Sequence, residues 1–173
     1  RASSKVNDDC MAEFEALIRP GITEKEMAEA IRGIYAAHGC SGVSFPPICG
    51  FGAHAADPHH DNDDTPLEAG QCVLIDVGGV YQDYCSDMTR TFFTGEPSEE
   101  ERKVYELVRQ AQAAAEALVK PGVRLCDIDA AARDLITEAG YGPYFNHRLG
   151  HFIGLEDHEA GDVSAVNENV VTP

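Results

Sequence analysis

Residues 75–79 read Ile-Asp-Val-Gly-Gly, and residues 86–91 read Ser-Asp-Met-Thr-Arg-Thr. The two stretches belong to segments rich in Val, Ile, Tyr, Thr and Phe, at 71–76 and 81–93, and a pair of glycines separates these segments. Residues of this kind on both sides of a glycine break predict two antiparallel strands. The decisive part of the chain is therefore expected to be a β-hairpin that carries Asp76 on its first strand and Asp87 on its second.

The predicted hairpin brings two acidic side chains together. A turn centred on Tyr81 and Gln82 places Asp76 directly opposite Asp87, with both side chains on one face. Like charges that face each other on a sheet are destabilising, because their Cβ atoms are only about 5 Å apart. A shared divalent cation compensates for this repulsion, since carboxylate oxygens bind Mn²⁺, Mg²⁺ and similar ions. Two solvated surface aspartates are the alternative interpretation.

Histidines cluster in two other parts of the chain. Three of the seven, His147, His151 and His158, fall within a run of twelve residues that also contains glycines and apolar residues. Such a cluster suits metal binding and proton transfer, and imidazole near carboxylates shifts the metal preference toward Mn, Co, Zn or Fe. His59 and His60 form the second cluster, although an acidic, solvated loop over residues 57–64 would explain that segment equally well.

Four helices are predicted from apolar residues at helical spacing and from Ser/Thr-x-x-Glu capping boxes. They run from the start of the chain to Pro20-Gly21, from Thr23 to about Gly39, from Ser98 to Pro121-Gly122, and from about Asp127 to Gly140.

The helices repeat at a constant offset of 101 residues, because Gly21 corresponds to Gly122 and Gly39 corresponds to Gly140. Two copies of a helix, Pro-Gly, helix, Gly unit are too few for a solenoid, so we expect two related halves with a functional site between them. Chance recurrence of ordinary helix punctuation is the alternative.

Composition limits the class of protein. The 173 residues, 43% of them hydrophobic, are enough for one domain with an ordinary core. A formal charge of −17 disfavours nucleic acid and anionic membranes as partners. No apolar run approaches the roughly 20 residues of a membrane span, and residues 1–9 are too polar for a secretion signal, so we expect a cytoplasmic protein. The six cysteines form no Cys-x-x-Cys pair and are expected to be reduced and packed as small apolar groups.

Residues 76–79, 84–92 and 150–159 together resemble the pita-bread metallopeptidases of family M24, in the branch of aminopeptidase P and Xaa-Pro dipeptidase (prolidase). The order and spacing of these motifs match over nearly the whole chain. The resemblance implies an α+β pita-bread fold with two pseudo-symmetric helix–helix–hairpin halves. The Ser-Asp-Met-Thr-Arg-Thr motif is closer to this branch than to the methionine aminopeptidases. Creatinase-like and chaperone-like relatives lack the metal-binding aspartates that this chain has.

The resemblance also implies a site and a reaction. Asp76, Asp87 and His151 correspond to metal ligands of a dinuclear centre, for which Mn²⁺ is the expected ion and Co²⁺ or Zn²⁺ are alternatives. His59, His147 and His158 correspond to the cleft histidines that bind the substrate and stabilise the reacting carbonyl. The implied reaction is hydrolysis of the peptide bond before proline, in Xaa-Pro dipeptides or at the N-terminus of peptides with proline in second position. A non-catalytic peptide- or protein-binding module, or an aminopeptidase of another specificity, are the alternatives.

Two departures from the family pattern matter. Phe152 stands where glycine usually follows the ligand histidine. The family also takes two glutamate ligands from strands after the His-Glu motif, and repeat partners of the two aspartates would fall near positions 177 and 188, past Pro173. Residues 1–173 are therefore expected to be a partial catalytic domain, without the N-terminal domain and the last strands and with an incomplete second half. We expect this chain alone to bind metal weakly and to be inactive, and the intact enzyme to be a homodimer as relatives commonly are.

Overall fold

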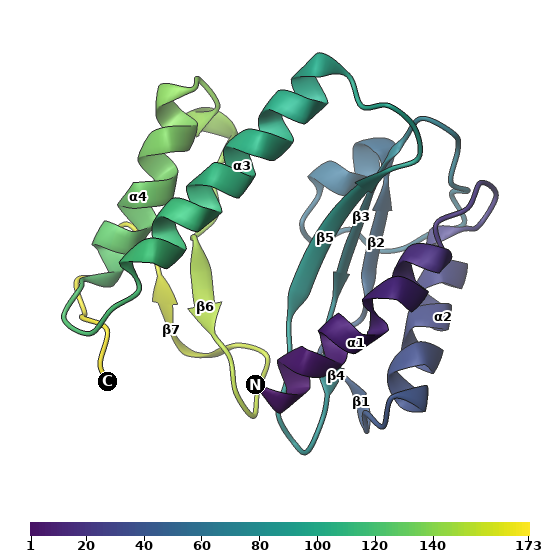
Figure 1. Ribbon diagram of the computed structural model, residues 1–173, viewed down its shortest axis with the longest axis horizontal. Coiled ribbons are helices and arrows are strands. Elements are labelled where there is room, and N and C mark those ends of the chain that lie inside the picture. The colour runs from purple at the N-terminus through teal and green to yellow at the C-terminus, as the bar shows by residue number, and fades with distance from the viewer. The chain divides into compact units, whose positions relative to one another are not determined.

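The computed structural model describes residues 1–173, which divide into two compact units. The first unit comprises Arg1–Pro97 and Ile153–Glu159, and the second comprises Ser98–Phe152 and Ala160–Pro173. Both units combine helices with strands, as the α+β prediction requires (Figure 1). No helix is both long and apolar enough to cross a membrane.

The first unit packs two helices against a small antiparallel sheet (Figure 1). The helices are α1 (Ala2–Ala16) and α2 (Glu24–Ala37), and the sheet has the strand order β2 (Ile48–Phe51), β3 (Cys72–Val77), β5 (Met88–Phe93). A short 3₁₀ helix, η1 (Gly52–Ala56), follows β2, and β1 (Gly42–Val43) pairs with β4 (Gly79–Val80). Alternate residues of β3 are buried against Phe14 and Met27 of the helices, so one face of the sheet forms the core and the other is available for a site.

The second unit is built on a pair of helices that lie side by side, α3 (Glu99–Leu118) and α4 (Leu125–Glu138) (Figure 1). A 3₁₀ helix, η2 (Gly142–Tyr144), follows them, and then β6 (Gly150–Phe152) pairs with β7 (Glu159–Val163). Small residues such as Ala111, Ala115 and Ala132 fill the helix interface together with Ile128 and Ile136, so the helices can approach closely.

All four predicted helices are present, and both capping boxes are complete. The fourth helix begins at Leu125, two residues before the predicted start at Asp127. Aspartate is a favoured cap, but here the first amides of the helix have backbone partners: Leu125 N donates to Asn169 O at 2.9 Å, and Cys126 N donates to Asn167 O at 2.8 Å. A side-chain cap is not needed at this helix start, which explains the difference.

The predicted repeat is a repeat of conformation as well as of sequence. Gly21 and Gly122 have φ angles of 91° and 89°, and Gly39 and Gly140 have 84° and 90°, in the left-handed region that favours glycine. The helices α2 and α4 both contain 14 residues. Each is preceded by a glycine whose amide bonds a distant carbonyl at 2.8 Å, Leu67 O in the first unit and Val171 O in the second. The two units therefore start from the same local design.

The register of the hairpin differs from the prediction. Tyr81 pairs with Tyr84, and the residues between them, Gln82 and Asp83, have φ angles of 52° and 69°. The turn is centred one residue later than expected, and positive φ at both central residues is the signature of a type I′ turn, for which Asn-Gly is the usual sequence signal. Gln-Asp lacks that signal, so the centre of the turn was misplaced.

The later turn centre moves the partner of Asp76. Asp76 faces Thr89, so the prediction that Asp76 directly faces Asp87 is wrong. The second strand is also shorter than the predicted 81–93, because β5 begins only at Met88. A shift of two residues keeps a side chain on the same face of a sheet, so the expectation of a shared face survives the correction.

Candidate active site

Asp76 and Asp87 project from the face of the sheet opposite the core. In β3, Asp76 lies between the buried residues Ile75 and Val77, and its Oδ1 accepts a hydrogen bond of 2.7 Å from Thr89 Oγ1. Asp87 is exposed and precedes the buried Met88, so it follows the same alternation as Thr89. The two side chains are therefore diagonal neighbours on one face, with their Cβ atoms about 7 Å apart.

The charges of both aspartates act on a third residue. Burial is the main reason why the pKa of the Tyr35 hydroxyl is raised, and neighbouring thiols and then the carboxylates of Asp87 and Asp76 raise this pKa further. Both carboxylates therefore lie close enough to Tyr35 for their negative charge to act on its hydroxyl.

Ser86 ties the segment before Asp87 to the core. Its hydroxyl, which is buried, donates to Asn7 Oδ1 at 3.0 Å and accepts from Gly79 N at 3.0 Å. Gly78 passes so close that a Cβ atom there would lie 1.8 Å from Ser86 O, so no other residue fits without displacement of the backbone. The Gly-Gly and Ser-Asp parts of the motif thus hold the aspartates in place, a role that the sequence did not reveal.

Two predicted cleft histidines belong to the first unit. His59 is exposed on the loop after η1, where its backbone amide donates to Asp57 Oδ1 at 2.9 Å. His158 is also exposed, and its Nδ1 lies 2.8 Å from Asp157 Oδ2. In both cases a neighbouring aspartate orders the histidine or its backbone. Their roles toward a substrate stay predictions.

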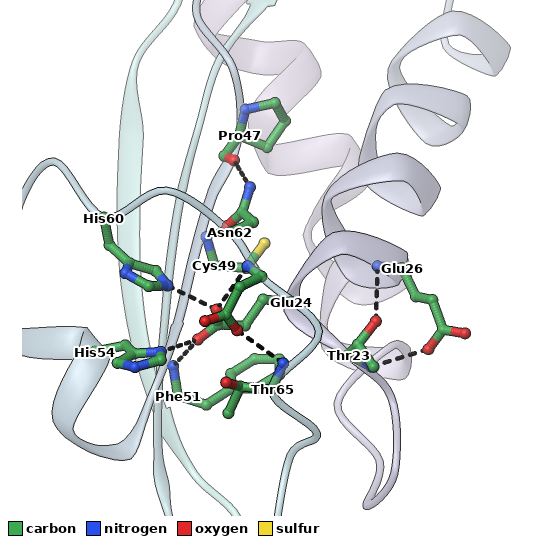
Figure 2. A network of polar contacts seen from close by, with 11 residues as sticks. Thr23, Glu24, Glu26, Pro47, Cys49, Phe51, His54, His60, Asn62 and Thr65 are labelled. Atoms are coloured by element: carbon green, nitrogen blue, oxygen red, sulfur yellow. Dashed lines mark hydrogen bonds and ion pairs between the residues drawn. The ribbon is translucent and has the colours of Figure 1, made fainter.

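The loop that carries His59 is anchored by a buried acid. Glu24, in the first turn of α2, has 0% of its side chain exposed. Its Oε1 accepts from Phe51 N at 3.0 Å and from His54 Nδ1 at 2.9 Å, and its Oε2 accepts from His60 Nε2 at 2.6 Å and from Asp63 N at 3.2 Å (Figure 2). The hydrogen bond to Glu24 raises the pKa of His54. The acidic segment 57–64 is therefore exposed but not simply a solvated loop.

Glu24 and His54 were not among the residues predicted from the sequence. A glutamate in the first turn of a helix is an ordinary feature, because it interacts favourably with the helix dipole, and it therefore gave no warning of a buried carboxylate. His60 was singled out only as a member of a histidine pair. The local sequence holds no signal for the cluster, because its three members come from α2, η1 and the following loop.

A second buried acid anchors the segment that carries His147. Asp129, with 0% of its side chain exposed, binds Arg133 through two bonds of 2.6 and 2.9 Å. Arg133 also donates to Phe145 O at 2.8 Å and to His147 O at 2.9 Å. The His147 ring is exposed, and its Nδ1 donates to Arg148 O at 3.1 Å. The ion pair therefore fixes the backbone of the predicted cleft residue to α4.

His151 lies in β6 and has a hydrogen-bonding pattern that suits a metal ligand. Its Nδ1 lies 3.1 Å from Phe152 O. A carbonyl oxygen can only accept, so Nδ1 carries the proton and the lone pair of a neutral ring lies on Nε2. Metal-binding histidines commonly donate their second ring N–H to such an acceptor. The donor types of Asp76, Asp87 and His151 thus fit divalent ions, and their shared role as ligands stays a prediction.

Phe152, which replaces the usual glycine, has a partner on the neighbouring strand. A Cβ atom on Gly161 would lie 2.3 Å from the Phe152 ring, so the ring occupies the space above that glycine. Gly161 itself has a φ angle of 116°. The large residue at 152 is accommodated by a missing side chain at 161.

Comparisons with known proteins agree with these features. The sequence model of metallopeptidase family M24 matches residues 1–173. A protein described as an uncharacterized peptidase of Staphylococcus aureus is 42% identical over 171 residues, which are 99% of this chain and 49% of that protein. The chain thus spans about half the length of the curated relatives that it matches.

Two solved structures show the same fold. An X-Pro aminopeptidase from Thermotoga maritima is 37% identical, with a TM-score of 0.95, over 99% of this chain and 49% of that one. A Xaa-Pro dipeptidase from Bacillus anthracis is 36% identical, also with a TM-score of 0.95, over 98% of this chain and 48% of that one. The agreement confirms the pita-bread fold expected from the motifs. The chain belongs to metallopeptidase family M24.

Proposed function

We propose that the full-length protein hydrolyses the peptide bond that precedes proline, in Xaa-Pro dipeptides or at the N-terminus of longer peptides. The observation that carries the proposal is the pair Asp76 and Asp87, held on one exposed face by a motif typical of the family. Relatives described as an X-Pro aminopeptidase and a Xaa-Pro dipeptidase support the proline specificity.

Asp76, Asp87 and His151 are the residues of this chain that would hold two divalent metal ions, with Mn²⁺ as the expected metal. When bound, such ions activate water and neutralise the charge that develops on the reacting carbonyl. The structural support is the chemistry of the donors: two carboxylates on one face, and an imidazole with its lone pair on Nε2. Co²⁺ and Zn²⁺ suit the same mixed oxygen and nitrogen donors.

The cleft histidines are assigned to binding and proton transfer. His158, oriented by Asp157, would support the reacting carbonyl oxygen. His147, whose backbone is held by Arg133, would contact the substrate backbone, and His59 would lie near the proline side. Each ring is carried by a segment that the protein orders through an acid, which limits the motion of the ring before substrate arrives.

The proposal is tested with three variants of the full-length protein and an Xaa-Pro dipeptide in the presence of Mn²⁺. Asp76→Asn and Asp87→Asn should each lower kcat/KM by more than about 100-fold, since loss of a supporting residue around a metal already costs about 10- to 100-fold. Asp83→Asn is the matched control, because it removes an exposed carboxylate from the same hairpin and asparagine tolerates the positive φ there. Equal activity of all three variants would contradict the assignment.

Assays with different peptides separate the proposed function from its alternatives. A non-catalytic module would bind peptides and turn none over, with or without metal. An aminopeptidase of another specificity would cleave Xaa-Ala as well as Xaa-Pro substrates, and a tripeptide with proline in second position distinguishes a dipeptidase from an aminopeptidase. We also propose that the full-length protein is a homodimer and lies in the cytoplasm. Light scattering, which measures its mass in solution, tests whether it is a dimer.

The chain of 173 residues by itself is expected to bind Mn²⁺ weakly and to show no turnover, because it supplies only three of the five ligands that the family uses. Calorimetric titration measures this directly. Tight binding of two Mn²⁺ ions by the 173 residues alone would show that the proposed ligand set is wrong.

A further inference from the structure

A second group of metal-binding side chains shares no residue with the predicted ligands Asp76, Asp87 and His151. One ligand atom from each of Glu24, His54 and His60 lies within 4.8 Å of the other two. The carboxylate is fully buried, whereas 36% of the His54 side chain and 11% of the His60 side chain are exposed. An ion could therefore reach the cluster from solvent past His54 and be held against a buried charge.

The surroundings of Glu24 prepare its carboxylate for a cation. Each carboxylate oxygen accepts one backbone amide, Phe51 N for Oε1 and Asp63 N for Oε2 (Figure 2). The amides fix the position of the carboxylate as outer hydrogen bonds do in metal centres. The remaining partner of each oxygen is an imidazole, and an imidazole is the one partner here that can itself become a metal ligand.

The spacing of the donors fits a small metal ion after a modest adjustment. The nitrogens of His54 and His60 lie 2.9 and 2.6 Å from the carboxylate oxygens, and the two ring centroids are 4.2 Å apart. Ligands about 2.0–2.2 Å from a tetrahedral Zn²⁺ ion lie about 3.3 Å from one another. Because the three donor atoms lie within 4.8 Å of one another, shifts of about 1 Å would bring them to that spacing around an ion.

We propose that Glu24, His54 and His60 form a metal site for Zn²⁺ or a similar transition-metal ion, separate from the site of Asp76, Asp87 and His151. Two imidazoles and a carboxylate are a donor set that binds Zn²⁺ or Fe²⁺ and leaves room for water. In the neutral rings the proton moves from the nitrogen that faces Glu24 to the other ring nitrogen, so the facing lone pair binds the ion. The carboxylates of Asp57 and Asp63 add negative charge near His54.

The site would have a structural consequence for the first unit. It joins the start of α2 to η1 and to the loop after it, and that loop carries His59. A bound ion would replace two hydrogen bonds by stronger contacts and so restrict the motion of the His59 segment. The proposal itself does not depend on peptidase activity, because it uses none of the residues assigned to the reaction.

The test uses Co²⁺, whose visible absorption reports its ligands, and the full-length protein with Asp76→Asn and Asp87→Asn, which disables the other site. This variant should bind one Co²⁺ with the intense visible bands of a low-coordinate ion, and Zn²⁺ should displace it. Adding His54→Asn, or separately His60→Asn, should weaken binding by at least about 10-fold. His38→Asn is the matched control, since it removes a histidine that lies 2.6 Å from Glu13, outside the cluster.

The outcomes separate this proposal from the proposed function. Absence of a Co²⁺ spectrum, or a spectrum and affinity unchanged by both cluster variants, would overturn the second site whatever the enzyme does. Conversely, a protein without turnover could still show the Co²⁺ spectrum. Circular dichroism of each variant checks that it is folded, so that a lost Co²⁺ spectrum reflects lost ligands. His54→Asn should disturb the fold least, because His54 is partly exposed.

Discussion

The two copies of the repeat each contain a buried acid that anchors a neighbouring segment, but the two acids differ in position and in partners. In each unit a buried acid on the second helix of the repeat anchors a segment that carries a predicted cleft histidine: Glu24 anchors the loop of His59, and Asp129 anchors the segment of His147. The acids are not at equivalent positions, because residue 125 is leucine where residue 24 is glutamate. The two copies therefore share a backbone design but anchor these segments through acids at different positions.

The partners of the two acids differ in kind. Asp129 binds a guanidinium, which keeps its charge at every ordinary pH and donates in a fixed fork. Glu24 accepts hydrogen bonds from two imidazoles, which a metal ion can displace, and from two backbone amides, which carry no charge. The first unit thus has an anchor that can accept a cation in place of its side-chain partners, whereas the second has its cation built into the chain.

The largest effect is expected at Glu24. Glu24→Ala should lower the free energy of unfolding by about 3 to 5 kcal/mol, because it leaves buried amides and imidazoles without their acceptor. Glu26→Ala, two residues along the same helix, removes only an exposed capping contact and should cost about 1 kcal/mol. Urea unfolding measures both. Similar costs for the two variants would show that the buried acid is not the anchor of the first unit.

A smaller loss is expected in the second unit. Arg133→Ala should cost about 2 to 4 kcal/mol, less than a fully buried pair because 28% of the arginine side chain is exposed. Arg109→Ala breaks a pair with Glu106 on the surface of α3 and should cost less than about 1 kcal/mol. Unfolding of both variants, followed by circular dichroism, compares a buried with an exposed ion pair. If Arg133 costs no more than Arg109, the anchoring role of Asp129 is refuted.

The smallest effect concerns the chemistry of the thiols. Burial, together with the negative charge of Glu24, raises the pKa of Cys49 to about 12, so its thiolate is scarce at pH 8. Cys126 of the second unit is half-buried. Iodoacetamide, which reacts with thiolates, should therefore label Cys126 well before Cys49 in the folded protein, as mass spectrometry of the peptides can determine.

The raised pKa of Cys49 also makes the stability of the folded protein depend on pH. In the unfolded chain Cys49 ionises near its ordinary pKa of 9.0, whereas the folded chain keeps it protonated up to about 12. The unfolded state is therefore favoured progressively as pH rises from about 9 toward 12, and stability from this group is complete only below pH 9. Replacement of Cys49 by alanine should reduce this alkaline loss, and an unchanged slope of stability against pH would contradict the assignment.

The sequence by itself determined the helices, the repeat and the family motif. These features depend on neighbours three or four residues apart, such as Thr23 with Glu26 and Ser98 with Glu101. They depend also on glycines at positions where the backbone is left-handed. Local chemistry of this kind is complete within a few residues, so it can be deduced from the order of residues alone. The family motif and the glycine repeat then led to the fold, which the comparisons confirmed.

Only the tertiary structure decided the register of the hairpin and the environment of Glu24. The register depends on the backbone of Gln82 and Asp83, whose left-handed conformations are not signalled by a turn sequence such as Asn-Gly. The role of Glu24 depends on His54 and His60, which packing of distant segments brings to the same carboxylate. Burial, which turns an ordinary helix-start glutamate into an anchor, is a property of the packed unit and not of the sequence around it.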